Sequence, residues 1–229
     1  MSPGFRLFDR PDIVHDTSAL AGLNTADISD GMSRSGTMSG IASVYRPVQS
    51  VCGPAVTVSV PAGGFSMVKL GLQLCQPGDV LVITVRGDLT NAVWGGNLSI
   101  GAQQSGVAAV VVDGAIRDID QIQGLGFPVF AAGIATSASP LSVSFGEVNV
   151  PIACGRVVVA PGDIIVADAD GIVCVRPQDI AEVIAATVAV SDGHQRVMPQ
   201  LLRGEVTSHA AIEQSMLDAG LLIAGRSWP

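Results

Sequence analysis

Charged residues are scarce in this 229-residue sequence, and basic residues are the minority among them. Asp, Glu, Lys and Arg together make up 14% of the chain, with 12 Lys and Arg against 20 Asp and Glu and a net charge of −8 at pH 7. A surface that binds nucleic acid is therefore not expected, because such a surface needs an excess of positive charge. The mean hydropathy of +0.49 is high for a monomer and predicts an apolar interface between subunits.

Long apolar stretches are also absent. No run approaches the roughly 18 residues that are needed to cross a bilayer, and the first residues, MSPGFRLFDRPD, lack the apolar core of a signal peptide. The sequence therefore predicts a cytoplasmic protein that does not associate with a membrane.

Several familiar motifs are missing as well. The four cysteines form no CxxC pair, which argues against a zinc site or a disulfide framework. Neither GxGxxG nor GxxxxGK occurs, so a nucleotide-binding or adenosylmethionine-binding loop is not expected. No nucleophile motif accompanies the histidines, which argues against a hydrolase. These histidines are His15, His194 and His209.

Apolar runs alternate with helical patterns in the first two thirds of the chain, and short strands follow at close spacing. Such an order predicts an α/β fold with mixed sheets. The longer strands are expected at Val51–Val60, Val80–Val85, Gly106–Val112 and Phe127–Ala132. The shorter ones are expected at Val148–Ala153, Val157–Val159, Ile164–Ala167 and Ile172–Val175.

Both ends of the chain differ from this central pattern. Residues 1–16 show no periodicity and are interpreted as an arm, and residues 17–180 form the α/β domain. Residues 181–229 form a C-terminal helical region, within the domain or at an interface, and its first helix is expected to be interrupted at Ser191–Gly193. Two short helices precede the first long strand, and Thr25 is a candidate cap for the second.

The stretch from Trp94 to Leu98, WGGNL, is predicted to open a helix. Its glycines allow ligand atoms to approach the backbone closely. The first amides of a helix lack internal partners and lie at its positive end, so this opening suits a small anion.

Three ionisable residues follow the strand at Gly106–Val112: Asp113, Arg117 and Asp118. Arg117 offers a planar fork that matches a carboxylate, and Asp118 offers an oxygen ligand for Mg²⁺ or Mn²⁺. Spacing alone leaves another interpretation open. Asp113 could cap the turn, Asp118 could favour the start of the next helix, and Arg117 could be a surface charge.

Several motifs together resemble the RraA-like family, which includes 4-hydroxy-4-methyl-2-oxoglutarate aldolases and the regulator of ribonuclease activity A. The central matches are WGGNL, DGAIRD after the buried strand, and GFPVFAAG. Further matches are TADISDGM, GPAVTV, PGDVLVI and CGRVVVAPGDIIVADADGIVCV, so that the resemblance covers roughly residues 20–180 in the right order.

The resemblance implies a swivelling β/β/α sandwich like the phosphohistidine domains, assembled as a homotrimer or homohexamer. It implies a lyase that uses Mg²⁺ or Mn²⁺ to cleave a small 2-oxo acid, such as 4-hydroxy-4-methyl-2-oxoglutarate or oxaloacetate, to pyruvate through an enolate. Asp118 would ligate the metal, and Arg117 would bind the substrate and assist catalysis. Backbone amides of Gly95, Gly96, Asn97 and Leu98 would hold the substrate carboxylate. The alternative is a catalytically silent regulator that binds a ribonuclease.

Two positions depart from the aldolase pattern. An acid usually follows the first glycine of the WG element, but this chain has Gly96 there. A second acid, which in the family comes from the C-terminal helix of a neighbouring subunit, aligns near His194; Asp192 or Glu205 could replace it.

Overall fold

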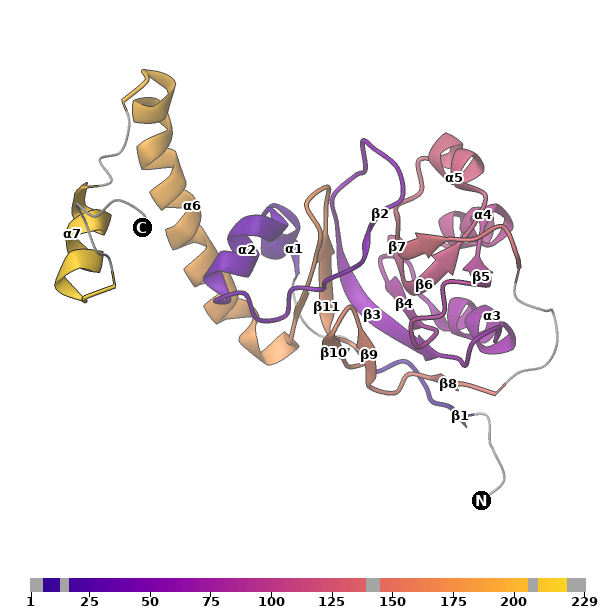
Figure 1. Ribbon diagram of the computed structural model, residues 1–229. Coiled ribbons are helices and arrows are strands. Elements are labelled where there is room, and N and C mark those ends of the chain that lie inside the picture. Colours follow the sequence, from indigo (N-terminus) through magenta and orange to yellow (C-terminus); the bar gives the residue numbers. More distant parts are fainter. Residues whose placement is uncertain (1–5, 13–16, 139–144, 206–209, 222–229) are drawn as a thin grey trace. The chain divides into compact units, whose positions relative to one another are not determined.

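A computed structural model describes residues 6–12, 17–138, 145–205 and 210–221 (Figure 1). The strands are β1 (Arg6–Leu7), β2 (Ala42–Ser43), β3 (Val51–Ser59), β4 (Val80–Thr84), β5 (Ala92–Trp94), β6 (Ala109–Ile116), β7 (Val129–Ile134), β8 (Glu147–Val148), β9 (Ile152–Cys154), β10 (Val157–Val159), β11 (Ile164–Ala167) and β12 (Ile172–Val175). The helices are α1 (Ser18–Ala21), α2 (Thr25–Gly31), α3 (Ser66–Leu74), α4 (Gly96–Gln104), α5 (Ile119–Leu125), α6 (Ile180–Leu202) and α7 (Ala210–Asp218), and a 3₁₀ turn at Pro177–Asp179 precedes α6.

The chain divides into two compact units, residues 1–190 and 191–229. A mixed sheet in the order β1-β8-β3-β4-β6-β7-β2 forms the centre of the first unit. Strands β3, β4, β6 and β7 run parallel. Helices α3, α4 and α5 lie together beside these strands (Figure 1). The α/β fold with a mixed sheet and flanking helices is thus as predicted.

Strand β3 belongs to two pairings. Its second half pairs in parallel with β4, from Ala55↔Val80 to Ser59↔Thr84. Its first half pairs antiparallel with β11, which continues into the β11–β12 hairpin. The turn Asp168–Gly171 closes this hairpin, and Asp168 N donates to Gly171 O at 3.0 Å. A single nine-residue strand therefore links the parallel strands to the hairpin.

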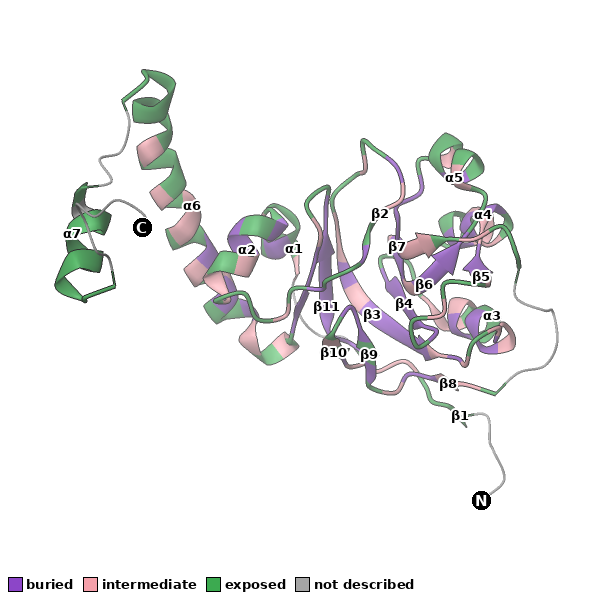
Figure 2. Ribbon diagram, viewed as in Figure 1, coloured by how far each residue is buried: buried purple, intermediate pink, exposed green. Residues whose placement is uncertain are grey.

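Three apolar clusters fill the spaces between the layers of the first unit. The first lies between the parallel strands and helices α3–α5 and contains Trp94 and Phe127. The second joins the other face of these strands to β9–β12, and the third joins the hairpin to α1, α2 and the start of α6. Alternate residues of β11 face the second and third clusters, so the strand is buried on both faces (Figure 2). Such continuous burial explains why the sheet strands read as unbroken apolar runs.

Several predicted boundaries were wrong. The strand expected at Gly106–Val112 runs instead to Ile116, so Asp113 lies in β6 and not in a turn. Asn24, not Thr25, caps α2: its side-chain oxygen accepts a bond from Asp27 N at 2.7 Å. The segment Val148–Ala153 contains two strands, β8 and β9, with Asn149 between them in the left-handed region.

The C-terminal helical region also differs from the prediction. Helix α6 continues through Ser191–Gly193 without interruption and includes Pro199. Within residues 191–229, no described residue is buried (Figure 2). Large apolar side chains there are exposed, among them Leu202 at 81% and Leu221 at 76%. In the described part of the chain, no helix combines the length and the apolar character that a membrane span requires.

The N-terminal segment is attached to the domain by a buried ion pair. Strand β1 pairs with β8, and Arg10 donates two hydrogen bonds of 2.7 Å to Asp79. Asp79 is fully buried, and it also accepts the amide of Gln76 at 2.8 Å. The hydrogen bond to Asp79 raises the pKa of Arg10 above its ordinary value. The segment interpreted as an arm is therefore held at residues 6–10.

Replacing Arg10 by Met should lower the free energy of unfolding by about 2–4 kcal/mol, because it leaves a buried carboxylate without its cation. Urea denaturation followed by circular dichroism measures this change. Arg176→Met is the matched control, since the Arg176–Asp179 pair is exposed and its loss should cost less than about 0.5 kcal/mol. Equal losses in the two variants would contradict a stabilising role for the Arg10 pair.

Candidate functional site

Parallel pairing of two strands brings the glycine loop to the Arg117–Asp118 pair. Strand β5 pairs with the end of β6 through Ala92↔Ala115 and Trp94↔Ile116. The next backbone contact continues this pairing, since Arg117 N donates to Trp94 O at 3.1 Å. Gly95 and Gly96 therefore lie beside Arg117 and Asp118, although about 20 residues separate them in the sequence.

A hydrogen bond between backbone and side chain then joins the two segments. Gly96 N donates to Asp118 Oδ2 at 3.1 Å, and Arg117 Nε lies 3.7 Å from the same oxygen. Asp118 has a φ of 63°, an unusual conformation for a residue other than glycine. Asp118 occupies the N-cap position of α5, but its side chain makes no capping bond there. Asp118 thus stands at the start of α5, as the alternative interpretation expected, but its carboxylate bonds to the glycine loop and not to the first turn of the helix.

Gly95 permits this close approach. A Cβ atom at position 95 would lie 2.6 Å from Asp118 Oδ2 and 3.3 Å from Arg117 Cγ. Trp94 fixes the loop from the other side, since its indole Nε1 donates to Ser99 Oγ at 2.8 Å. Ser99 Oγ in turn donates to Gly95 O at 3.1 Å. The helix start is thus held rigidly against Asp118.

The first amides of α4 differ in what they can bind. The Gly96 amide is already bonded to Asp118. Within the described residues, the amides of Asn97 and Leu98 have no hydrogen-bond partner, as is usual at the second and third positions of a helix. These two amides lie at the positive end of the helix dipole and can donate hydrogen bonds to an anion.

Most of the predicted site residues line one cleft of roughly 390 Å³. It is lined by Phe65, Lys69, Ala92, Val93, Trp94, Gly95, Asn97, Leu98, Arg117, Asp118 and Ala138. Gly96 lies behind this surface and contributes through its bond to Asp118. The side chains of Arg117 and Asp118 are 45% and 39% exposed, so both are accessible to a ligand.

Helix α3 supplies a wall of the cleft that the sequence analysis missed. Phe65 and Lys69 line it, and Lys69 Nζ lies 5.1 Å from the centroid of the Phe65 ring. A helical segment with apolar spacing gives no sign that it faces a site. One signal was present nonetheless: Lys69 is the only lysine among the 229 residues.

The space above Gly96 is not empty. A Cβ atom at this position would lie 2.0 Å from Gln121 Oε1 and 2.3 Å from Gln121 Cδ. The Gln121 carboxamide therefore lies where a side chain of residue 96 would begin. Position 96, where the resemblance to the aldolases implies an acid, therefore adjoins the neutral amide of Gln121.

Asp118 is the single carboxylate among the residues that line this cleft. Across the described residues, no three Asp, Glu, His or Cys side chains gather in a group that could hold a metal. Mg²⁺ nevertheless binds through one or two carboxylates when a ligand and water complete its shell. The Asp118 carboxylate can supply one oxygen ligand to such a cation.

Other ionisable residues lie away from this cleft. Asp30 lines a separate depression with Ser33 and Arg34. Arg86 and Asp113 line another cleft, where Asp113 Oδ2 accepts the amide of Gly155 at 3.3 Å. Neither Asp30 nor Asp113 therefore serves the Arg117–Asp118 site.

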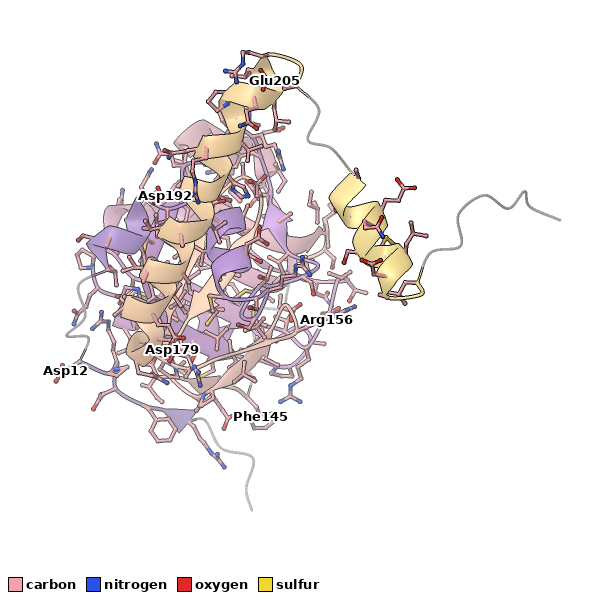
Figure 3. The ribbon with its side chains drawn as sticks, turned by 90° about the vertical axis from the view of Figure 1, so that its left-hand side faces the viewer. Asp12, Phe145, Arg156, Asp179, Asp192 and Glu205 are labelled. Atoms are coloured by element: carbon pink, nitrogen blue, oxygen red, sulfur yellow. The ribbon has the colours of Figure 1, made fainter. Side chains whose placement is uncertain are left out.

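The acids considered as replacements near the C-terminus belong to the second unit. Asp192 is an exposed residue of α6 (Figure 3). Glu205 follows the end of α6 and accepts a 2.7 Å bond from Arg203 Nε (Figure 3). A role for either acid at the Asp118 site stays a prediction.

Comparison with known proteins identifies related chains. The RraA-like family, described as Aldolase/RraA, matches residues 25–174. A Halalkalibacterium halodurans protein named "Putative 4-hydroxy-4-methyl-2-oxoglutarate aldolase" is 40% identical over 136 residues, which are 58% of this chain and 63% of that protein. The match thus spans less than two thirds of that relative.

Two solved structures share the fold. Streptomyces coelicolor RraAS2, described as an unusual member of the RNase ES inhibitor RraA protein family, superposes with a TM-score of 0.73 at 27% identity, covering 83% of this chain and 98% of that chain. The RNA-processing inhibitor RraA from Thermus thermophilis has a TM-score of 0.60 at 28% identity, covering 67% and 92%.

The contact between position 96 and Gln121 leads to a prediction about metal affinity. Gly96→Asp alone should bind Mg²⁺ no better than the wild type, because Gln121 obstructs the new side chain. Gly96→Asp combined with Gln121→Ala should bind Mg²⁺ about tenfold more tightly, because a second carboxylate then adjoins Asp118. Titration calorimetry measures both affinities, and Gln121→Ala alone is the control. A double variant with wild-type affinity would show that position 96 does not face the cation.

Proposed function

Because this chain belongs to the RraA-like family, we propose that it is a divalent-metal-dependent lyase that cleaves a small 2-oxo acid to pyruvate. Oxaloacetate and 4-hydroxy-4-methyl-2-oxoglutarate are the expected kinds of substrate. One observation carries the proposal: a single cleft contains the Asp118 carboxylate, the Arg117 guanidinium and the unpaired amides of Asn97 and Leu98. This set combines an oxygen ligand for a cation with three donors for an anion.

The residues have separate tasks in this proposal. The amides of Asn97 and Leu98 bind the carboxylate next to the keto group, and Arg117 binds the same end of the substrate through its fork. Asp118 would hold Mg²⁺ or Mn²⁺. The bound cation would supply a Lewis acid next to the keto oxygen. The bond from Gly96 N keeps the Asp118 carboxylate oriented toward the cleft.

Cleavage breaks the bond between the third and fourth carbons of the substrate. The fourth carbon leaves as carbon dioxide from oxaloacetate, or as a carbonyl compound from a 4-hydroxy acid after loss of the hydroxyl proton. The electron pair moves onto the remaining fragment and gives pyruvate enolate, which then takes a proton from water. Arg117 and the helix amides offset the negative charge that develops on this fragment.

The wider implications of the family remain part of the proposal. The layering of sheet, hairpin and helices supports a swivelling sandwich of the phosphohistidine-domain type. Exposed apolar side chains of α6 and α7 support assembly into a homotrimer or homohexamer. The competing function is a silent regulator that binds a ribonuclease, in line with the descriptions of the Streptomyces and Thermus proteins. A regulator of this kind would not need a carboxylate that a ligand can reach, such as that of Asp118.

Purified protein should decarboxylate oxaloacetate only when Mg²⁺ or Mn²⁺ is present, and a chelator should abolish the activity. Asp118→Asn keeps the shape but removes the charge, so it should eliminate activity together with metal dependence. Arg117→Lys keeps the charge but loses the fork, so kcat/KM should fall about 10²-fold. Pyruvate release coupled to a dehydrogenase measures these rates.

Asp120→Asn is the matched control for Asp118. Asp120 is an exposed acid in the first turn of α5, and it does not line the cleft. It should therefore leave the rate unchanged. A wild-type rate equal to that of free Mg²⁺, or full activity in Asp118→Asn, would refute the lyase and favour the regulator.

Assembly is tested separately. Light scattering after size exclusion should give the mass of three or six chains. Leu202→Glu should weaken this assembly, because it places a charge on an exposed apolar helix face. A stable monomer of the wild type at micromolar concentration would contradict the proposed oligomer.

A further inference from the structure

Lys69 is the only lysine in the chain, and it lines the cleft that contains Arg117 and Asp118. It lies in the first half of α3, and Phe65 is the residue that directly precedes this helix. The ammonium nitrogen is 5.1 Å from the centre of the Phe65 ring. An aromatic face attracts a cation at this distance and restrains where it lies.

Among the described residues, no carboxylate of the cleft forms an ion pair with Lys69. Asp118 is the single acid of the lining, and its Oδ2 already accepts the Gly96 amide and lies 3.7 Å from Arg117 Nε. In the part of the chain that the structure describes, Lys69 forms no ion pair. The cleft therefore has two cations and one anion, and the second cation is available to a ligand.

We propose that Lys69 recognises the second carboxylate of the substrate and so selects dicarboxylic over monocarboxylic 2-oxo acids. This inference rests on the proposed function, in which Arg117 and the helix amides hold the carboxylate beside the keto group. Lys69 belongs to α3, whereas Arg117 follows β6, so the two cations enter the cleft from different elements. Trp94 and Leu98 form apolar lining that suits the short carbon chain of such a ligand.

The environment of Lys69 suits a permanently charged ammonium group better than a neutral amine that acts as a nucleophile. An amine that attacks a keto group must be neutral, and lysines with this task are usually buried in apolar pockets or placed beside other cations that remove the proton. Lys69 is exposed, and its ammonium is attracted to an aromatic ring. Lys69 therefore acts as a charge that binds an anion, and is a specificity-determining residue.

The test compares two ligands that differ at one end only. 2-Oxopentanedioate and 2-oxopentanoate have the same carbon chain, but the second has a methyl group in place of the distal carboxylate. Lys69→Met should weaken binding of the diacid about fivefold to tenfold and leave the monoacid within about twofold. Lys69→Arg should retain most of the preference. Calorimetry in the presence of Mg²⁺ measures each affinity.

Arg86→Met is the matched control, because Arg86 is an exposed cation that lines the cleft with Asp113 instead. It should leave the affinities for both ligands unchanged. Added salt should reduce the wild-type preference for the diacid, because an exposed ion pair is screened.

The single lysine also permits a direct readout that does not depend on turnover. Reductive methylation with ¹³C-formaldehyde labels Lys69 and the N-terminal amine while the positive charge is kept. The Lys69 methyl signal should shift on addition of 2-oxopentanedioate and not on addition of 2-oxopentanoate. The N-terminal signal should stay in place in both titrations.

Three results would overturn the assignment. The Lys69→Met variant could bind both ligands equally more weakly, it could bind the diacid with unchanged affinity, or the Lys69 methyl signal could fail to shift when the diacid is added. If borohydride trapped a pyruvate adduct on Lys69, this residue would form an imine with the substrate, and its assignment as a fixed charge would be wrong. These results are distinct from failure of the proposed lyase, because binding of a ligand that is not cleaved is measured without any reaction.

Discussion

The site depends on the parallel pairing of β5 with the end of β6. Two residues of each strand pair, and the bond from Arg117 N to Trp94 O extends the contact by one residue. Since β6 is also paired with β4 and β7 and buried among them, its end has little freedom to move. The loop Gly95–Gly96 is therefore held against Asp118 by the buried end of β6, as a binding site requires.

The position of Asp118 shows how this constraint changes the role of a residue. At the start of a helix an aspartate normally caps the first turn. Here the backbone of Asp118 lies in the left-handed region, and its carboxylate accepts the amide of Gly96 instead. The helix start of α4 thus gives one amide to Asp118, and the amides of Asn97 and Leu98 remain for a ligand. Strain at one residue is accepted where it orients a functional side chain.

Local patterns predicted those elements whose boundaries are set locally. The strands Ile164–Ala167 and Ile172–Val175 were predicted to the residue, because apolar runs flank a turn rich in aspartate and glycine. The end of β6 was not predicted, since Asp113 and Gly114 resemble a turn. Instead Gly114 is a residue of β6, where a Cβ atom would lie 2.0 Å from Val85 Cγ2. Arg117 and Asp118 could be predicted as neighbours in the sequence. Lys69 stands out in the sequence as the only lysine, but its place at this cleft could not be predicted, because only tertiary packing brings α3 there.

In the proposed function, the charges of the cleft couple the binding of metal and ligand. Lys69 and Arg117 outnumber Asp118, so a divalent cation that arrives alone meets one favourable charge and two unfavourable ones. A dianionic ligand reverses this balance, because it brings two negative charges and further oxygen ligands for the cation. Each partner should therefore raise the affinity for the other by the same factor. A site with this charge balance is suited to a cation that binds together with the diacid.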